Sequence, residues 1–164
     1  MTTFKFIGIG QAVSKMSVKS IPDGYHTATP YLVVEGASRL IDFLKQAFKV
    51  TETYRLTYPD GKLKHAEVKV GDSIIMLGDA RGNWNHMPSS IYLYVPDTDI
   101  AYRDALDAGA ISLTEPEDQF YGDRNAVVRD PVGNLWVIAT HVEDVSAEEL
   151  AKREQAVLKK DSES

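Results

Sequence analysis

The chain contains no cysteine, which excludes disulfide bonds, thiolate zinc sites and cysteine nucleophiles. It also lacks an excess of basic residues, because 18 lysines and arginines face 24 aspartates and glutamates, for a net charge of −6. Nucleic acids and anionic membranes are bound by basic surfaces, so neither partner is expected. No run of about 20 apolar residues predicts a membrane-spanning helix, and no targeting segment is convincing. A cytoplasmic location is therefore the expectation.

What is present fits one folded domain. The chain has 164 residues, of which 43% are hydrophobic and 26% charged, close to the average for globular proteins. A turn cluster, Ile21-Pro22-Asp23-Gly24, ends an N-terminal arm over residues 1–24. We expect a single domain over residues 25–145, followed over residues 146–164 by a C-terminal helix and a frayed tail.

The chain repeats itself once. Thr29 to Val34 aligns with Ser90 to Val95, 61 residues later, which places Tyr31 on Tyr92. The same offset brings residues 73–77 onto residues 134–138. Two copies are too few for a solenoid, so they predict two supersecondary modules, over about residues 25–80 and 88–141, that pack against each other.

Each module has the pattern of a βαβββ unit. Apolar spacing predicts a helix over residues 37–48 and a second one from Asp97 or Thr98 to Gly109. Ser146-Ala147-Glu148-Glu149 predicts a capped helix that reaches about residue 159. Alternation and turn residues predict strands at 27–34, 52–58, 64–70, 73–78, 90–95, 111–115, 124–130 and 134–140. The expected fold is α+β, with helices on one face of a curved antiparallel or mixed sheet and a ligand cup on the other.

Several motifs resemble one superfamily. They are Gly24-Tyr25-His26-Thr27-Ala28-Thr29-Pro30-Tyr31-Leu32, His65-Ala66-Glu67 with Gly71-Asp72-Ser73, Tyr121-Gly122-Asp123-Arg124, Arg129-Asp130-Pro131-Val132-Gly133-Asn134 and Ala139-Thr140-His141-Val142-Glu143-Asp144-Val145. With the double βαβββ pattern, they resemble the vicinal oxygen chelate superfamily of glyoxalases, bleomycin resistance proteins and extradiol dioxygenases, and within it the PhnB-like branch. The resemblance implies paired modules, a homodimer and a small-molecule site in the cup. It implies no particular reaction, because one fold serves many functions.

The metalloenzymes of that superfamily hold a divalent ion with His, Glu or Gln side chains on strands that face the cup. By the resemblance, these ligand positions fall here on Thr29, Met76, Ser90 and Val137. None of these residues is a credible ligand for zinc, nickel or iron, since such sites need imidazole or carboxylate donors. We therefore expect no cofactor and no metal at the usual position.

Strand alternation predicts the lining of the cup. If Leu32 and Leu93 pack under the helices, Tyr31, Tyr92 and Tyr94 face the other way. With Met76, these tyrosines form an aromatic, mildly polar surface that suits a flat or amphipathic organic ligand. The alternative is that they fill an ordinary core or a dimer interface.

His65 and Glu67 are the strongest candidates for catalysis. They lie two residues apart on a predicted strand, so their side chains project from one face. A carboxylate beside an imidazole can orient a general base, or supply two ligands of an atypical metal site. The alternative is a solvated polar strand face. One pair also falls short of the three ligands that a metal site usually needs.

Three further residues are candidates for ligand binding. Trp84, in the loop that joins the modules, is either a lid over the cup or an anchor for a partner chain. Tyr121 and Arg124 belong to a loop near the mouth of the second module. Arg124 can pair with an anionic ligand, or form a salt bridge with Asp123 or Asp130.

Two functions follow from these patterns. The first is a dimeric protein that binds a small organic molecule in an aromatic cup without the usual metal. The second is an enzyme of the superfamily, of the lyase or dioxygenase type, with His65 and Glu67 as an acid–base pair or as part of an atypical metal site. A module whose cup is simply packed core is a third possibility.

Overall fold

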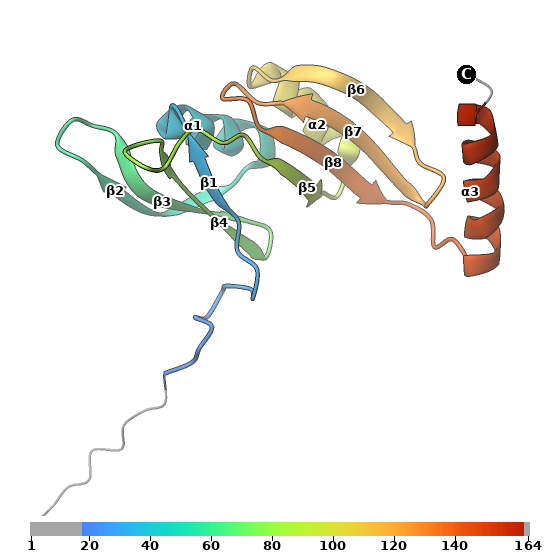
Figure 1. Cartoon of the computed structure of the whole chain (residues 1–164), viewed down its shortest axis with the longest axis horizontal. Coiled ribbons are helices and arrows are strands. Elements are labelled where there is room, and N and C mark those ends of the chain that lie inside the picture. Colours follow the sequence, from blue (N-terminus) through green and yellow to red (C-terminus); the bar gives the residue numbers. More distant parts are fainter. Residues whose placement is uncertain (1–17, 163–164) are drawn as a thin grey trace, which may run out of the picture.

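The computed structural model describes residues 18–162. Helices and strands follow one another in two similar series, and a third helix ends the chain (Figure 1). The elements are β1 (Tyr31–Val34), α1 (Ala37–Phe48), β2 (Thr51–Thr57), β3 (Leu63–Val70), β4 (Ser73–Asp79), β5 (Ser90–Tyr94), α2 (Thr98–Asp107), β6 (Ile111–Asp118), β7 (Asp123–Arg129), β8 (Leu135–His141) and α3 (Ala147–Ser162).

The strands form two four-stranded mixed sheets with the same topology. Their orders are β1-β4-β3-β2 and β5-β8-β7-β6, and neither sheet closes into a barrel. In each sheet the first pair is parallel and the other pairs are antiparallel. Tyr31 pairs with Met76, and Tyr92 pairs with Val137, so both ladders keep the register that the repeat predicts. The α+β fold of two βαβββ modules is confirmed.

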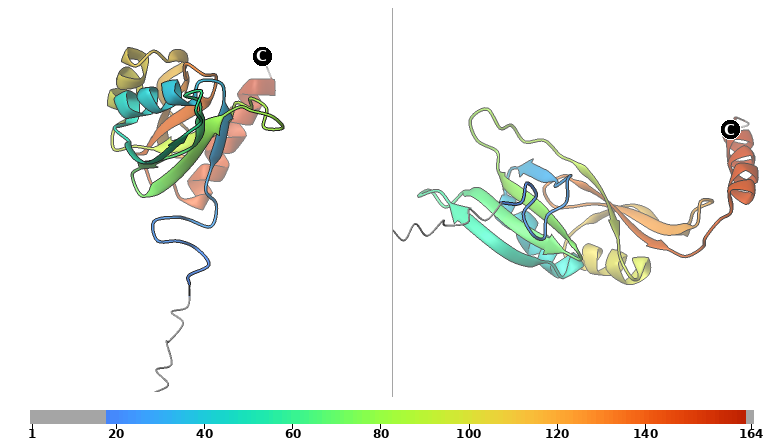
Figure 2. Two further views of the ribbon diagram at one scale, coloured as in Figure 1. Left: turned by 90° about the vertical axis from the view of Figure 1, so that its left-hand side faces the viewer. Right: turned by 90° about the horizontal axis from the view of Figure 1, so that it is seen from below.

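Both modules share one hydrophobic core. Helices α1 and α2 lie on the same side of the sheets, where they pack side by side (Figure 2). The rings of Phe48 and Trp136 lie 5.3 Å apart between centroids, which joins the first helix to the second sheet. Leu32 and Ile138, on β1 and β8, are completely buried beneath the helices. Among the helices of residues 18–162, none covers the opposite faces of the sheets.

Helix α1 receives its N-terminal cap from a strand. Gly36 precedes the helix in a left-handed conformation and has no side chain to offer. The Asp79 carboxylate at the end of β4 accepts hydrogen bonds from the backbone N–H groups of Gly36 and Ala37, at 3.0 Å each. It also accepts one from Leu63 at 2.6 Å. A negative charge at a helix N-terminus is favourable, so Asp79 joins β3, β4 and α1.

Most predicted boundaries agree with the structure to within one residue, and four differ by more, one of them the end of α2, which lies at Asp107 and not at Gly109. Strand β1 begins at Tyr31 because the Thr29 hydroxyl turns back to donate to the His26 carbonyl. Strand β6 continues to Asp118, and α3 continues to Ser162. Asp97 caps α2 by accepting a hydrogen bond from Ile100 N–H, as predicted.

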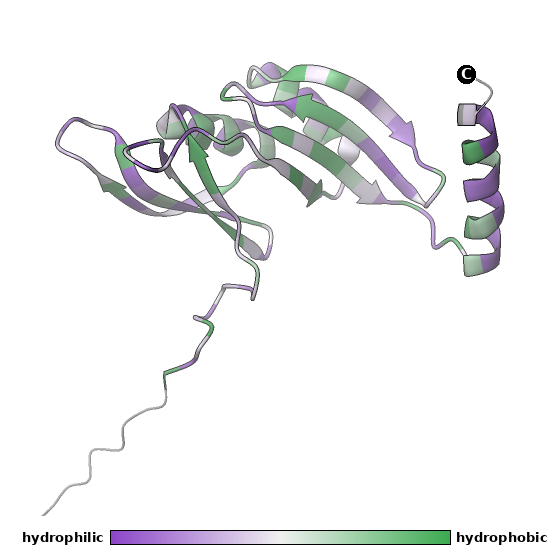
Figure 3. Ribbon diagram, viewed as in Figure 1, coloured by the Kyte–Doolittle hydropathy of each residue, from purple (hydrophilic) through white to green (hydrophobic). Residues whose placement is uncertain are grey.

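Helix α3 stands apart from the two sheets, beyond the end of β8 (Figure 1). It shows alternating hydrophilic and hydrophobic bands (Figure 3). Arg153 attaches it to the body by ion pairs with Glu143 and by a hydrogen bond to the Phe120 carbonyl. Within residues 18–162, no helix is both long and apolar enough to cross a membrane.

Candidate functional site

A row of side chains crosses the uncovered face of the first sheet. Tyr31, Met76, Glu67 and Tyr54 occupy successive register positions on β1, β4, β3 and β2. Side chains at paired positions project from the same face of a sheet. Tyr31 and Tyr54 are more than a third exposed, because no helix covers this face. The structure thus brings together three of the predicted residues and adds Tyr54.

His65 and Glu67 are in contact on this face. His65 Nε2 lies 3.2 Å from Glu67 Oε1, and His65 Nδ1 lies 3.4 Å from the Tyr31 hydroxyl. The Tyr25 hydroxyl donates to Glu67 Oε2 at 2.6 Å. This hydrogen bond, with a smaller effect of His65, holds the pKa of Glu67 below its usual value, while the same bond raises the pKa of Tyr25. Glu67 is therefore a carboxylate with a hydrogen-bond donor on each oxygen.

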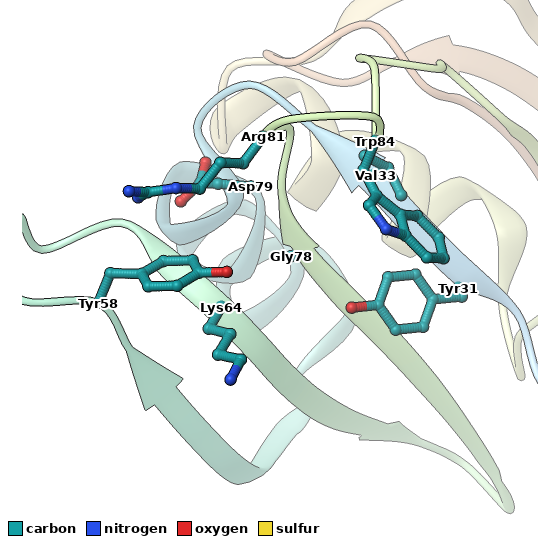
Figure 4. Close-up of a pocket in the computed structure, with 8 residues that line it drawn as sticks. All are labelled: Tyr31, Val33, Tyr58, Lys64, Gly78, Asp79, Arg81 and Trp84. Atoms are coloured by element: carbon teal, nitrogen blue, oxygen red, sulfur yellow. The ribbon is translucent and has the colours of Figure 1, made fainter.

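Trp84 lines a cavity of about 220 Å³ at one end of this row (Figure 4). Its ring lies 5.7 Å from that of Tyr31, between centroids. Across the cavity, the Tyr58 hydroxyl points toward that of Tyr31, and Arg81 lies 4.2 Å above the Tyr58 ring (Figure 4). Trp84 is 65% exposed, so one face of the indole is available to a ligand. Both predicted roles of Trp84, lid over the cup and anchor for a partner chain, stay predictions.

The second sheet carries a different cluster on its uncovered face. Asp123 begins β7 with its side chain only 5% exposed. Its Oδ2 accepts hydrogen bonds from the hydroxyls of Tyr92 and Tyr94, at 2.8 and 2.9 Å. Its Oδ1 lies 2.8 Å from His141 Nδ1. One carboxylate thereby orients two tyrosine rings and an imidazole.

The charges in this cluster stabilise one another. Burial raises the pKa of Asp123, but the hydrogen bonds from His141, Tyr92 and Tyr94 outweigh it and lower that pKa overall. Hydrogen bonds to Asp144 and Asp123 raise the pKa of His141. Burial and hydrogen bonding raise the pKa of Tyr92, and the bond to Asp123 raises that of Tyr94. Asp123 is therefore ionised while both tyrosines keep their protons.

Tyr121 joins the same cluster. Its hydroxyl accepts a hydrogen bond from Asn125 Nδ2 at 2.8 Å and lies 3.5 Å from the Tyr92 hydroxyl. The structure thus brings Tyr92, Tyr94 and Tyr121 together, and their role in ligand binding stays a prediction. A second cavity, of about 330 Å³, lies between β5 and the turn joining β3 to β4, with Tyr92 and Tyr94 in its wall.

Arg124 lies apart from these tyrosines. It alternates with Asp123 and Asn125 along β7, so its side chain lies on the side covered by α2. There it pairs with Asp99, through its Nε at 2.6 Å, and with Asp118 at 3.0 Å. A salt bridge was foreseen for Arg124, but the expected partners, Asp123 and Asp130, are wrong. Because two carboxylates already form ion pairs with its guanidinium group, Arg124 is not part of the proposed site.

The residues present do not fit the divalent metal that this fold suggests. The predicted ligand positions hold Thr29, Met76, Ser90 and Val137, which offer no imidazole or carboxylate. His65 and Glu67 supply only two donors, and both already have partners. Across residues 18–162, no group of three or more His, Asp or Glu side chains is placed to hold a metal ion.

Sequence reasoning missed several residues of the two clusters. His141, one residue beyond the last predicted strand at 134–140, is the last residue of β8 and pairs with Asp123 across the ladder. Asp123 itself was considered only as a partner for Arg124. Tyr54 shares its face with Glu67, and the alternation of β2 was the signal for it. Tyr25 belongs to the arm, where no periodicity indicates what it contacts.

Comparison with known proteins agrees with this architecture. Two βαβββ modules, each with one face under a helix and one aromatic face left open, define an α+β protein of the glyoxalase type. The sequence-family model of the glyoxalase/bleomycin resistance protein/dioxygenase superfamily matches residues 25–138, and the chain belongs to that superfamily. An uncharacterised protein of Mycobacterium bovis is 38% identical over 133 residues, 74% of this chain and 88% of that protein.

Solved structures show the same fold at lower identity. TioX from Micromonospora sp. ML1 has a TM-score of 0.61 and 24% identity, covering 70% of this chain and 97% of that one. A superfamily member from Burkholderia phytofirmans has a TM-score of 0.57 and 17% identity, with 70% and 97% covered. These likenesses support the fold and carry no ligand over to this chain.

Proposed function

We propose that this protein binds a small organic molecule on the open aromatic faces of its sheets, without a catalytic metal. The observation that carries the proposal is that large aromatic rings are exposed to solvent beside carboxylates whose hydrogen-bond partners are already in place. Tyr92 is 44% exposed and Tyr94 62% exposed, although both hydroxyls are fixed by Asp123. Rigid rings with fixed polar groups are the usual lining of a binding site.

A homodimer of the PhnB-like type is part of this proposal. Apolar side chains that one chain leaves exposed on its strands include Leu56 on β2 and Ile111 and Leu113 on β6. A second copy that covers such strands removes apolar surface from water, which favours association. The motifs around His65-Ala66-Glu67 and Asp130-Pro131-Val132-Gly133-Asn134 support the PhnB-like branch. Light scattering of the purified protein tests the dimer directly.

The binding proposal predicts a ligand that depends on Trp84. In a thermal-shift screen of flat aromatic compounds, a ligand of the folded state raises the unfolding midpoint. Trp84→Ala is expected to weaken that ligand about three- to tenfold, because an aromatic stacking contact contributes about 0.5–1.5 kcal/mol. Leu158→Ala, on the exposed surface of α3, is the matched control and leaves affinity unchanged. A library without any ligand contradicts the proposal, and hits that bind Trp84→Ala equally well contradict the role of Trp84 in binding.

One observation favours a second function, an enzyme of the superfamily. His65 and Glu67 are in contact, and this is the geometry of a base and the group that orients it. If the protein turns over its ligand, His65→Ala with Glu67→Ala is expected to abolish turnover while the ligand of Trp84 still binds. Elemental analysis belongs to the same test. A metal content near one per chain favours a metal site that includes His65 and Glu67. A content of less than about a tenth of a metal per chain favours the binding protein.

A further inference from the structure

The segment before β1 loops in front of the first sheet (Figure 2). Seven residues of the segment and Met76 of β4 line a cavity of about 470 Å³; the seven are Ser20, Ile21, Pro22, Tyr25, His26, Thr27 and Thr29. Residues 18–24 are all exposed, and in the segment only Tyr25 and Thr29 are partly buried. The segment therefore covers part of the open face without becoming part of the core.

Few polar contacts hold the segment against the sheet. Among residues 18–28, the hydrogen bonds of Lys19 with Asp23 and of Tyr25 N–H with Pro22 stay within the segment. The one side-chain hydrogen bond that these residues make to the sheet is that of the Tyr25 hydroxyl to Glu67. His26 adds only a 4.0 Å approach to an exposed carboxylate, that of Asp72. The position of the segment thus depends on one phenol.

Glu67 is built to receive a neutral O–H donor on an aromatic ring. Its Oε1 is taken by His65, and its Oε2 accepts the phenol at 2.6 Å, a length typical of a charge-assisted O–H···O⁻ bond. Around it, the rings of Tyr31 and Tyr54 lie 5.7 and 5.8 Å from that of His65. A ligand carboxylate at this position meets the charge of Glu67, whereas a phenol exchanges one hydrogen bond for an identical one.

We propose that Tyr25 is an internal occupant of a phenol-binding site on Glu67, and that a phenolic ligand takes its place when the segment moves away. This inference rests on the proposed small-molecule function and names the class of ligand for the first sheet. The exchange needs no new polar partner, because Tyr25 regains water as the ligand gains Glu67.

The test uses p-cresol, which is the tyrosine side chain as a free molecule. Tyr25→Ala opens the site, and p-cresol is expected to bind this variant at least tenfold more tightly than it binds the wild type. Toluene, which lacks the hydroxyl, is expected to bind Tyr25→Ala at least tenfold more weakly than p-cresol. In Tyr25→Ala with Glu67→Leu, which has no acceptor for the phenol, that preference for p-cresol is lost. Titrations followed by the NMR signals of the His65 ring report binding at the site itself.

His26→Ala is the matched control, because it alters the same segment without vacating Glu67 and removes only a 4.0 Å approach to an exposed carboxylate, which contributes little. It is expected to leave the affinity for p-cresol at the wild-type value. Equal affinities of Tyr25→Ala for p-cresol and toluene contradict the proposal, as does a p-cresol affinity no higher than that of the wild type. A circular dichroism spectrum and midpoint like those of the wild type confirm that Tyr25→Ala is folded.

A second measurement uses the unaltered chain. If p-cresol displaces Tyr25, tryptic cleavage after Lys19 accelerates several-fold at saturating p-cresol and stays constant with toluene. An unchanged rate contradicts the proposal.

The proposed small-molecule function and this inference fail under different outcomes. If a phenolic hit that shifts the His65 signals binds Tyr25→Ala and the wild type equally, the binding function stands and this inference fails. If p-cresol binds Tyr25→Ala but no compound binds the wild type, this inference stands and the proposed function fails.

Discussion

Replacing Asp130 by alanine is expected to lower the free energy of unfolding by about 3–5 kcal/mol, the cost of removing one partner from a buried charged network. The Asp130 carboxylate accepts four hydrogen bonds. Val132 N–H and Asn134 N–H donate to Oδ1 at 2.9 and 3.0 Å, and Asn134 Nδ2 and Trp136 Nε1 donate to Oδ2 at 2.8 and 2.9 Å. Asn134 and Trp136 are completely buried, so water does not replace the carboxylate.

Urea denaturation of the variant measures this loss. Asp107→Ala is the control, because Asp107 ends α2 on the surface and its loss is expected to cost less than about 0.5 kcal/mol. The midpoint of Asp130→Ala should fall with an unchanged slope if the variant still unfolds in one step. A loss under about 1 kcal/mol contradicts the role of Asp130 as the acceptor that holds this loop.

Asp130 also shows what a sequence pattern conveys and what it leaves out. Proline and glycine after it predict a turn, and the turn is there, because these residues restrict the backbone locally. The carboxylate is buried because Trp136, six residues later, returns to it. That contact depends on packing between a loop and a strand, which local preferences do not encode.

The fold was predictable for a related reason. Strand alternation and helical spacing are periodic, and because the pattern occurs twice in the chain, each assigned strand or helix is supported by two segments. Tyr31 and Tyr92 were placed on the open faces by alternation alone, and both are exposed there. Strand β1 is shorter than predicted because Thr29 bonds to its own segment. Alternation thus gives the face of a residue, but side-chain hydrogen bonds decide where the strand begins.

The candidate site was predictable only within single strands. His65 and Glu67 share β3, so their contact follows from a spacing of two. Asp123 and His141 lie on different strands, and their contact depends on the register of β7 against β8. Tyr25 reaches Glu67 from outside the sheets. Contacts between strands are therefore less predictable from the sequence pattern than contacts within one strand, and contacts from outside the sheets are the least predictable.

The two modules keep one backbone and differ in chemistry. Met76 and Val137 occupy equivalent positions beside Tyr31 and Tyr92. On β3 the open face offers an imidazole and an accessible carboxylate, whereas the carboxylate that begins β7 is buried and used to fix tyrosines. The first sheet is therefore the half suited to exchange a hydrogen bond with a ligand, and the second is a fixed aromatic wall.

Replacing Asp123 by asparagine is expected to change that wall more than any other conservative substitution. The neutral amide removes the charge whose hydrogen bond is the main cause of the raised pKa of Tyr94, so that pKa should fall toward its ordinary value. The pKa of Tyr92, which burial raises most, should fall less. Ultraviolet titration of the tyrosines measures the change. Stability should fall by about 2–3 kcal/mol, because hydrogen bonds to a charged group are lost.

The loss should depend on pH in a defined way. The pKa of Asp123 is lowered by folding, so its contribution is present above the unfolded value of about 4 and lost as the pH falls through the folded value. The pKa of His141 is raised by folding, so its contribution is complete below about 6.5 and lost as the pH rises through the folded value. The wild type should therefore exceed Asp123→Asn most between about pH 4 and pH 6.5.

Asp144→Asn is the matched control for Asp123→Asn, because both carboxylates bind the same imidazole. Asp144 is fully exposed, and in the described chain its side chain bonds only to His141, so the tyrosine titration should stay as in the wild type. An identical titration of Asp123→Asn and Asp144→Asn contradicts the role of Asp123. If only Asp123→Asn shifts the titration and also weakens a screened ligand, the buried carboxylate acts on binding through the tyrosines that it orients.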